Sequence, residues 1–322
     1  MLDRVFDNEC QKKLKQELDF IEPFTSMDQL ETRKSDFSNV ECIFSTWGHP
    51  ELSAEQIRKF FPKLKYVFYG AGTVQYFARP FFECGVRIFS AADANSIPVV
   101  EYCLAQILLA NKGFYQTCAI YSEGDYHTAK NYTSKFPGNY GEYVGIIGVG
   151  KIGRGVVEAL RPYKLKIAAY DPFLSDEASR SLGVELWSLD KIFEECSVIS
   201  NHLANNDQTQ GILHYGHFSK MKPFATFINT GRGAQVVEAD LVRALEEDAS
   251  RTAILDVTWP EPCEDNHPFF KMKNIFLTPH IAGSVGEELA RMGEFMYEEW
   301  DAINCGKASK YEVTAAMLET MA

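Results

Sequence analysis

The segment YVGIIGVGKIG, residues 143–153, decides the fold of this chain. Its first five residues form an apolar run of strand length that leads directly into three glycines spaced Gly-x-Gly-x-x-Gly. An amphipathic helical pattern follows, and a second apolar run then ends at Asp171. A strand, a glycine turn, a helix and a second strand that ends in an acid form the pattern of a dinucleotide-binding βαβ unit. For the glycines alone, an ordinary βαβ turn remains the alternative.

The residues of this pattern have separate physical roles in binding a dinucleotide. Gly148 allows a tight turn, Gly150 lets the backbone approach the pyrophosphate, and Gly153 lets the helix pack closely on the strand. The amides of Lys151–Ile152 open the helix, where the helix dipole favours negative charge. We expect Asp171 to accept hydrogen bonds from the adenosine ribose. The predicted cofactor is NAD rather than NADP, because a carboxylate repels a 2′-phosphate.

Length and composition limit the classes of protein to which the chain can belong. The 322 residues are enough for two domains, and 46% hydrophobic with 24% charged residues is the composition of a globular protein. A net charge of −12 disfavours nucleic acid or a membrane surface as the main partner. The eight cysteines show no paired spacing, and the N-terminus does not resemble a signal peptide. No apolar run reaches the roughly 18 residues of a membrane span. We therefore expect a cytoplasmic protein.

The region before residue 98 predicts a smaller parallel α/β sheet. Strands are expected at residues 40–44, 66–69 and 86–89. A helix is expected over Ser53–Phe61, with Ser53 as its cap and Gln56 at the capping-box position. The second strand leads into Gly70–Gly72, a bend that exposes backbone amides. Pro98 is expected to open a long helix through Leu109.

Residues 111–142 show no clear period and are too long for a simple connection, so we expect a functional, assembly or irregular segment. From residue 143 the pattern predicts a doubly wound parallel sheet. Its strands are expected at 143–148, 166–171, 197–201, 225–229, 252–256 and 275–278. Its helices are expected near 151–161, 175–182, 189–195, 215–221 and 238–247. A last helix at about 284–304 has to pack elsewhere, and returning to the first domain is the economical choice. We predict a discontinuous domain of residues 1–97 and 285–322 and a dinucleotide-binding domain of residues 98–284.

Three loops that follow late strands carry polar residues that would meet at the carboxyl edge of the sheet. They read NTGRG at 229–233, DVTWPEP at 256–262 and TPHIAG at 278–283. With these loops the sequence resembles the D-isomer-specific 2-hydroxyacid dehydrogenases over about residues 40–310. Residues 221–225, MKPFA, and residues 95–102, NSIPVVEY, also match the family.

The resemblance implies a fold and an activity. The fold is a Rossmann-type doubly wound parallel sheet plus a smaller flavodoxin-like α/β domain, with a cleft between them. The activity is the NAD-dependent interconversion of a small 2-keto acid and its D-2-hydroxy acid by hydride transfer. The family also implies a homodimer that uses residues 98–142.

The resemblance assigns the catalytic roles to Arg232, Glu261 and His280. A guanidinium suits a keto acid, because it holds the carboxylate bidentately and polarises the adjacent carbonyl. His280 is the acid that protonates the carbonyl oxygen during reduction. Glu261 orients the imidazole and favours its charged form. Taken one at a time, Arg232 is typical of a surface turn, His280 of a loop and Glu261 of a common Glu-Pro pair. Only their combination behind the glycine turn favours catalysis.

Further residues take roles in the family pattern. Asp256 resembles the acid beside the nicotinamide carboxamide, and Thr230 is expected to bind the cofactor. Gly70, Ala71 and Gly72 match the loop whose amides meet the substrate carboxylate.

The chain departs from the family pattern at Val74–Gln75, where an Asp-Asn-like pair is usual, and at Ala204, where proline is usual. The first departure changes the substrate-side wall. The aromatic residues of this region are expected to form a packed core rather than an aromatic pocket; they are Tyr69, Tyr76, Phe77, Phe81 and Phe82. His214 and His217 have no third ligand nearby, so no metal site is expected.

The predicted substrate is an unphosphorylated acid such as glyoxylate, hydroxypyruvate or a branched-chain keto acid. Residues 45–50 and 70–77 contain no Lys or Arg for a phosphate, and Arg79 lies just beyond them. The chain ends soon after its last helix, without room for the regulatory domain of many phosphoglycerate dehydrogenases. Two alternatives remain open, which are 3-phosphoglycerate dehydrogenase activity, with Arg79 as the phosphate contact, and a nicotinamide-responsive corepressor-like binding protein.

Overall fold

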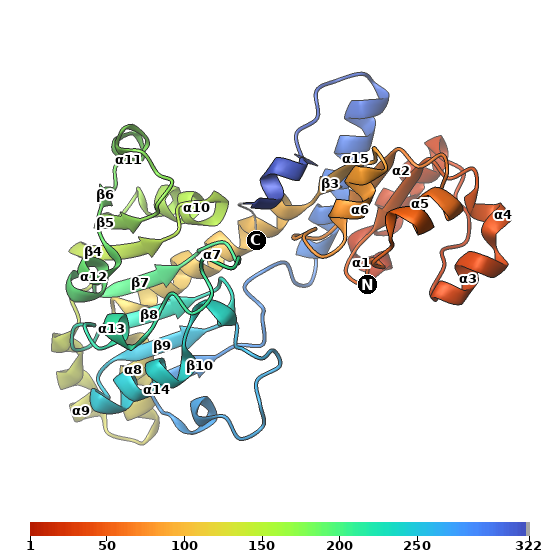
Figure 1. Ribbon diagram of the computed structural model, residues 1–322. Helices are drawn as coiled ribbons and strands as arrows, with labels where there is room; N and C mark the ends of the chain where they lie inside the picture. Colours follow the sequence, from red (N-terminus) through yellow and green to blue (C-terminus); the bar gives the residue numbers. More distant parts are fainter. Residues whose placement is uncertain (320–322) are drawn as a thin grey trace. The chain divides into compact units, whose positions relative to one another are not determined.

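The computed structural model describes residues 1–319 and divides into two compact units. The first unit consists of residues 1–95 together with the described residues from Ser284 onward, and the second consists of Ser96–Gly283. The elements of both units are labelled in Figure 1. Helix α7, Ala92–Ala110, begins in the first unit and continues into the second.

The second unit is built on a parallel sheet, which confirms the doubly wound fold. Its strands are β4 (Tyr140–Ile147), β5 (Lys164–Tyr170), β6 (Glu185–Leu186), β7 (Val198–Asn201), β8 (Thr226–Asn229), β9 (Thr252–Leu255) and β10 (Ile275–Leu277). Their spatial order is β10-β9-β8-β7-β4-β5-β6, and all neighbours are parallel. The strand order reverses between β4 and β7, where α/β proteins bind ligands, and the glycine turn follows β4. The two-residue β6 was not predicted.

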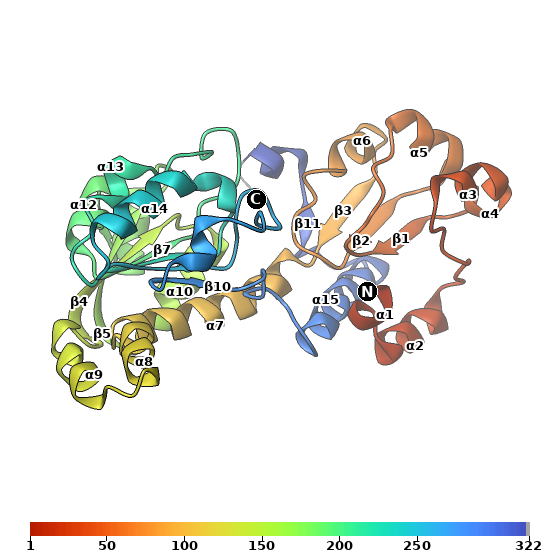
Figure 2. The same cartoon turned by 90° about the horizontal axis from the view of Figure 1, so that it is seen from below.

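Helices cover both faces of this sheet. One face packs against α12 (Leu189–Glu195), α13 (Tyr215–Phe218) and α14 (Glu238–Glu247), and the other against α7, α10 (Lys151–Leu160) and α11 (Asp176–Leu182). Figure 2 shows α12, α13 and α14 on one side of the strands and α10 with α7 on the other. The buried residues of β4 alternate between the two cores, with Ile146 on the α10 side and Ile147 on the α12 side. This alternation is the period of two expected of a strand with two buried faces.

The first unit is a smaller α/β sheet of order β1-β2-β3-β11. Its strands are β1 (Cys42–Ser45), β2 (Tyr66–Tyr69), β3 (Arg87–Ser90) and β11 (Glu312–Val313), of which β11 is antiparallel. Among the described residues the parallel strands follow chain order, so the order reversal of flavodoxin sheets is not seen. The reason is that the chain before β1 forms helices instead of strands, namely α1 (Leu2–Val5), α2 (Asn8–Glu17), α3 (Met27–Thr32) and α4 (Lys34–Phe37).

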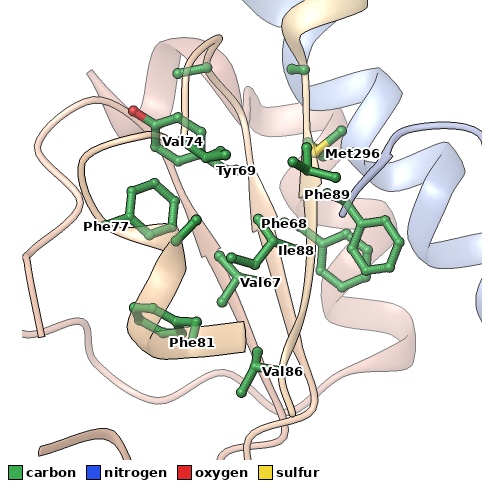
Figure 3. Close-up of a cluster of buried hydrophobic side chains, with 14 of the residues drawn as sticks. Val67, Phe68, Tyr69, Val74, Phe77, Phe81, Val86, Ile88, Phe89 and Met296 are labelled. Carbon is green, nitrogen blue, oxygen red and sulfur yellow. The ribbon is translucent and has the colours of Figure 1, made fainter. Parts of the chain in front are cut away.

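The remaining elements of this unit pack around an aromatic core. They are α5 (Ala54–Phe60), α6 (Ala78–Glu83), α15 (Glu288–Asn304) and the short helix η4 (Ala315–Glu319). The predicted capping box of α5 is present, since Ser53 and Gln56 each accept the other's backbone N–H. Figure 3 shows Tyr69, Phe77 and Phe81 packed together. These rings are at most 2% exposed, which confirms the core interpretation for them, whereas Tyr76 is 42% exposed.

The prediction that helix α7 starts at Pro98 was wrong, and of the three interpretations of residues 111–142 the irregular one does not hold. Helix α7 begins at Ala92 rather than at Pro98, because Ser90 Oγ accepts the Ala92 N–H at 3.2 Å and so starts the helix earlier. Pro98 lies inside the helix, where it costs one intrahelical hydrogen bond.

Most of residues 111–142 is also regular rather than irregular. It forms α8 (Phe114–Ser122), α9 (Tyr126–Tyr132) and the short helix η1 (Thr133–Lys135) before β4 begins. Asp125 caps α9 by accepting the Thr128 N–H at 2.9 Å. Helix α8 buries none of its residues, so it carries no amphipathic period that would reveal it in the sequence.

None of the helices within residues 1–319 is long and apolar enough to cross a membrane. The same residues contain no group of three or more His, Cys, Asp or Glu side chains that could hold a metal ion.

Candidate active site

The glycine turn has the shape that a dinucleotide requires. Gly148 has a φ of +84°, and a Cβ there would lie 2.7 Å from the carbonyl of His202. A Cβ on Gly153 would lie 2.0 Å from the carbonyl oxygen of Gly148. Around Gly150, by contrast, a Cβ would meet no atom within 4 Å. Gly150 is also the N-cap residue of α10 and brings no capping side chain, and the N-terminus of a helix favours an anion.

Asp171 follows the last residue of β5 and is held beside this turn. Its Oδ2 accepts the Val149 N–H at 2.7 Å, and its Oδ1 accepts the Phe173 N–H at 2.8 Å. The carboxylate therefore lies at the carboxyl edge of the sheet, next to the amides that open α10. A turn open at Gly150, uncapped amides and a fixed acid fit an NAD molecule in this place.

The three predicted catalytic residues follow neighbouring strands of this sheet. Arg232 follows β8, Glu261 lies in the loop after β9, and His280 follows β10. Nδ1 of His280 lies 2.6 Å from Oε1 of Glu261, so the structure brings acid and orienting carboxylate together. Burial lowers the pKa of the Arg232 guanidinium, and the negative charge of Glu261 opposes this shift. An arginine, a carboxylate and an imidazole thus share one edge of the sheet.

His280 has a φ of +55°, a conformation that non-glycine residues rarely adopt and that strains the backbone. Asp256, which is 2% exposed, holds the loop in this conformation. Its carboxylate accepts the N–H groups of Ile281 and Ala282 at 2.8 and 2.9 Å and the hydroxyl of Thr278 at 2.6 Å. Sequence reasoning missed this task of Asp256, and its expected contact with a carboxamide stays a prediction.

The Arg232 turn is fixed by a buried amide network that sequence reasoning also missed. Asn201 donates to Asn229 at 3.0 Å and to Gln235 at 2.7 Å. The side-chain amide of Asn229 in turn donates to the carbonyl of Arg232, and the side-chain oxygen of Gln235 accepts the Arg232 N–H. The only signal in the sequence is that Asn201 and Asn229 each end a strand, and those two residues face each other in the sheet register.

The loop of Arg232 also packs directly on the loop of Glu261. A Cβ on Gly233 would lie 2.1 Å from the carbonyl of Thr258, so only glycine fits between the two loops. The separation of the two loops is therefore set by backbone packing.

Thr230 lies behind these loops and is 8% exposed. Its hydroxyl contacts Cys103 Sγ at 3.3 Å and His202 Nδ1 at 3.5 Å. The side chain is thus engaged within the protein, and its predicted contact with the cofactor remains untested.

The predicted substrate loop belongs to the first unit. The N–H of Gly70 donates to the carbonyl of Ser45 at 2.7 Å, and Ser90 Oγ donates to the carbonyls of Ala71 and Gly72 at 3.0 and 2.5 Å. Val74 is fully buried, whereas Gln75 Nε2 donates to the carbonyl of Leu318 at 2.5 Å. Both residues that depart from the family pattern therefore stabilise the loop from within its own unit.

Arg79, the expected phosphate contact of the alternative substrate, forms an exposed ion pair with Glu319 at 3.7 Å. His214 caps α13 by accepting the Gly216 N–H at 3.1 Å.

His202 makes the stability of the second unit depend on pH. Burial lowers its pKa from 6.5 to about 4. Because the unfolded chain binds this proton more readily, stability is fully present above pH 6.5 and is lost as the pH falls toward 4. When the pH falls from 7 to 5, the wild type should lose about 2 kcal/mol more of its unfolding free energy than the His202→Gln variant loses. Urea unfolding at both pH values measures this, with the exposed His127→Gln as control. An equal pH dependence of His202→Gln and wild type would contradict it.

Comparisons with known proteins agree with this geometry. The family model described as D-isomer specific 2-hydroxyacid dehydrogenase, NAD binding domain, matches residues 104–282. The D-3-phosphoglycerate dehydrogenase of Mycobacterium tuberculosis is 33% identical over 250 residues, which are 73% of this chain and 46% of that protein. The glyoxylate reductase of Aeropyrum pernix is 35% identical over 167 residues, which are 52% of this chain and 50% of that protein. The chain thus spans about half or less of the length of these curated relatives.

Solved structures show the same fold at lower sequence identity. The apo form of Rhodotorula graminis D-mandelate dehydrogenase matches with a TM-score of 0.81 and 22% identity, covering 95% of this chain and 94% of that one. A phosphoglycerate oxidoreductase from Rhizobium etli also matches with a TM-score of 0.81 and 22% identity, covering 99% and 96%.

Proposed function

The chain belongs to the D-isomer-specific 2-hydroxyacid dehydrogenase family and contains its NAD-binding domain, and we propose that it interconverts a small 2-keto acid and its D-2-hydroxy acid. The observation that carries the proposal is the 2.6 Å contact between Glu261 and His280, beside Arg232, on the sheet edge that also holds the glycine turn. Bound nicotinamide supplies or accepts the hydride. The remaining work of binding, orientation and proton transfer belongs to the chain's own residues.

His280 is the proton donor to the carbonyl oxygen during reduction and the acceptor during oxidation. Glu261 contacts Nδ1, which orients the ring and leaves Nε2 free to face a substrate. Arg232 binds the substrate carboxylate, because its planar guanidinium matches two carboxylate oxygens. We assign substrate binding to the first unit as well, with the amides of Ala71 and Gly72 contributing to the carboxylate site; the Gly70 N–H already donates to the Ser45 carbonyl.

The substrate that we propose is unphosphorylated. The loops at residues 45–50 and 70–77 contain no Lys or Arg, and Arg79 is already paired with Glu319. Phosphoglycerate oxidation is the second candidate, which the names of several relatives favour. A panel of glyoxylate, hydroxypyruvate and branched-chain keto acids with NADH, beside 3-phosphoglycerate with NAD, tests both. A preference for the phosphorylated acid overturns our choice, and failure of every acid would favour a nicotinamide-responsive binding protein.

The preference for NAD over NADP follows from Asp171. Its carboxylate is fixed beside the glycine turn, and a 2′-phosphate placed there would cost on the order of a few kcal/mol. We expect wild type to favour NADH strongly and the Asp171→Ser variant to narrow that preference, measured as the ratio of kcat/KM values. Phe173→Ala is a suitable control, because that side chain is 79% exposed on the same loop. Equal efficiency of the wild type with both cofactors would refute the role of Asp171.

We further propose a homodimer that uses residues 98–142. Apolar and aromatic side chains are exposed here, with Phe114 at 44%, Tyr121 at 57% and Tyr126 at 53%. Exposed apolar patches of this kind favour a protein partner. Sedimentation at micromolar concentration should give a dimer, and Phe114→Glu with Tyr121→Glu should give a monomer. A wild-type monomer would contradict the assignment.

The cysteines support a reducing compartment. All eight are free, which suits the cytoplasmic location that we propose.

A further inference from the structure

A second carboxylate, that of Glu238, lies behind the turn that carries Glu261 and has no part in the reaction proposed above. Glu238 is the first residue of α14, and its side chain is 11% exposed. Oε1 accepts the backbone N–H of Trp259 at 2.8 Å, and Oε2 lies 3.3 Å from Nε2 of His267. Both carboxylate oxygens are therefore engaged with the segment that follows β9.

The contacts of His267 determine which of its nitrogens carries the proton. Nδ1 accepts the backbone N–H of Phe269 at 3.4 Å, at the start of the short helix η3, Pro268–Lys271. The ring also packs against the buried ring of Phe269, with 4.3 Å between centroids. Since a nitrogen that accepts a hydrogen bond carries no proton, the proton is on Nε2, which faces Glu238. Glu238 thus accepts one hydrogen bond, from Trp259, and lies within ion-pair distance of His267.

The turn between Thr258 and Glu261 is held at its first peptide group. Gly233 packs against the carbonyl of that group, as described above, and Glu238 accepts its N–H, which belongs to Trp259. Within the turn, Thr258 Oγ1 donates to the carbonyl of Pro260 at 2.9 Å. Glu261 follows two residues after Trp259, so any movement of the anchored amide moves the carboxylate that meets His280.

We propose that Glu238 is a positioning residue that holds the Thr258–Glu261 turn in place, so that the Glu261 carboxylate reaches the His280 imidazole. His267 supports it by fixing the second carboxylate oxygen. The inference rests on the proposed function, because it requires His280 as the acid.

The Glu238→Gln variant tests this with little change in size. Glutamine has one acceptor oxygen and cannot serve both Trp259 and His267, so one contact is lost. We expect kcat for reduction to fall about 10-fold, within the roughly 100-fold that a 1 Å misplacement costs. The loss should fall on kcat and leave the KM for the keto acid nearly unchanged, because Glu238 holds the turn and does not contact the substrate.

A double-mutant cycle separates positioning from general damage. If Glu238 acts through Glu261, adding Glu238→Gln to Glu261→Gln should change kcat by less than about 2-fold. Asp240→Asn is the matched control, since Asp240 lies on the same helix and accepts a backbone N–H at 3.0 Å, but from Tyr215. It should leave kcat and KM unchanged. Multiplicative losses in the double variant, or a loss in Glu238→Gln that falls on KM rather than on kcat, overturn the proposal.

Hydrogen exchange of the backbone amides of residues 256–264 tests the anchoring by Glu238 separately from the proposed function. Glu238→Gln should speed exchange there and Asp240→Asn should not. If the wild type turns over no keto acid, the proposed function fails, whereas unchanged exchange in Glu238→Gln refutes the anchoring by itself.

Discussion

Replacing His280 with alanine is expected to reduce turnover of the keto acid by about 10²–10⁴-fold, the range for loss of a general acid. NADH affinity should stay nearly unchanged, because the glycine turn and Asp171 follow β4 and β5, whereas His280 follows β10. Steady-state oxidation of NADH measures turnover, and a fluorescence titration measures NADH binding. Among the residues that the structure describes, Glu261 is the ring's one polar contact, so removal of the ring should disturb little else.

The exposed His127→Ala variant serves as the control for the loss of an imidazole. Full activity of His280→Ala with normal NADH binding would show that another group donates the proton, and the assigned roles would be wrong.

Replacing Arg232 with alanine should lower kcat/KM by about 10²–10⁴-fold, since two charge-assisted hydrogen bonds of about 1.5–3 kcal/mol each are lost. Arg232→Lys should recover only part of this, because an ammonium keeps the charge but not the bidentate geometry. The turn itself should survive, because Asn229 and Gln235 bind the backbone of Arg232 and not its guanidinium.

Added guanidinium ion should partly restore Arg232→Ala and leave His280→Ala unaffected. If Arg232→Lys is as active as the wild type, bidentate binding of the carboxylate is not what this residue does.

The second unit was predictable because its signals are local. The glycine turn, the strand that precedes it and the acid that ends β5 lie within 29 residues, and each has one physical reason to be there. The strands that follow are short apolar runs that end in polar loops, and Arg232, Glu261 and His280 stand in those loops. The order of motifs therefore placed these residues along one sheet edge.

The errors arose where local signals conflict with tertiary structure. Pro98 is a typical first residue of a helix, yet Ser90 caps α7 earlier and the packed helix tolerates the proline. Helix α8 carries no apolar stripe, so its sequence resembles a loop.

The supporting residues of the site were hidden for a different reason. Asp256, Glu238 and Gln235 act mainly on backbone groups, and backbone partners leave no trace in side-chain patterns. The tertiary structure decides which backbone N–H the side chain of an acid or of a glutamine will contact.

The discontinuity of the first unit has a consequence for synthesis on the ribosome. Strand β3 pairs with β11 across more than two hundred residues, and a Cβ on Gly293 of α15 would lie 2.0 Å from the carbonyl oxygen of Val5 near the N-terminus. The second unit is continuous in the chain and is available to fold as soon as it emerges. The first ninety-five residues, by contrast, must wait for the last segment to be translated before their core closes. During that interval the edge of β3 and the apolar face that will receive α15 are uncovered, and these are the surfaces that a chaperone would have to shield.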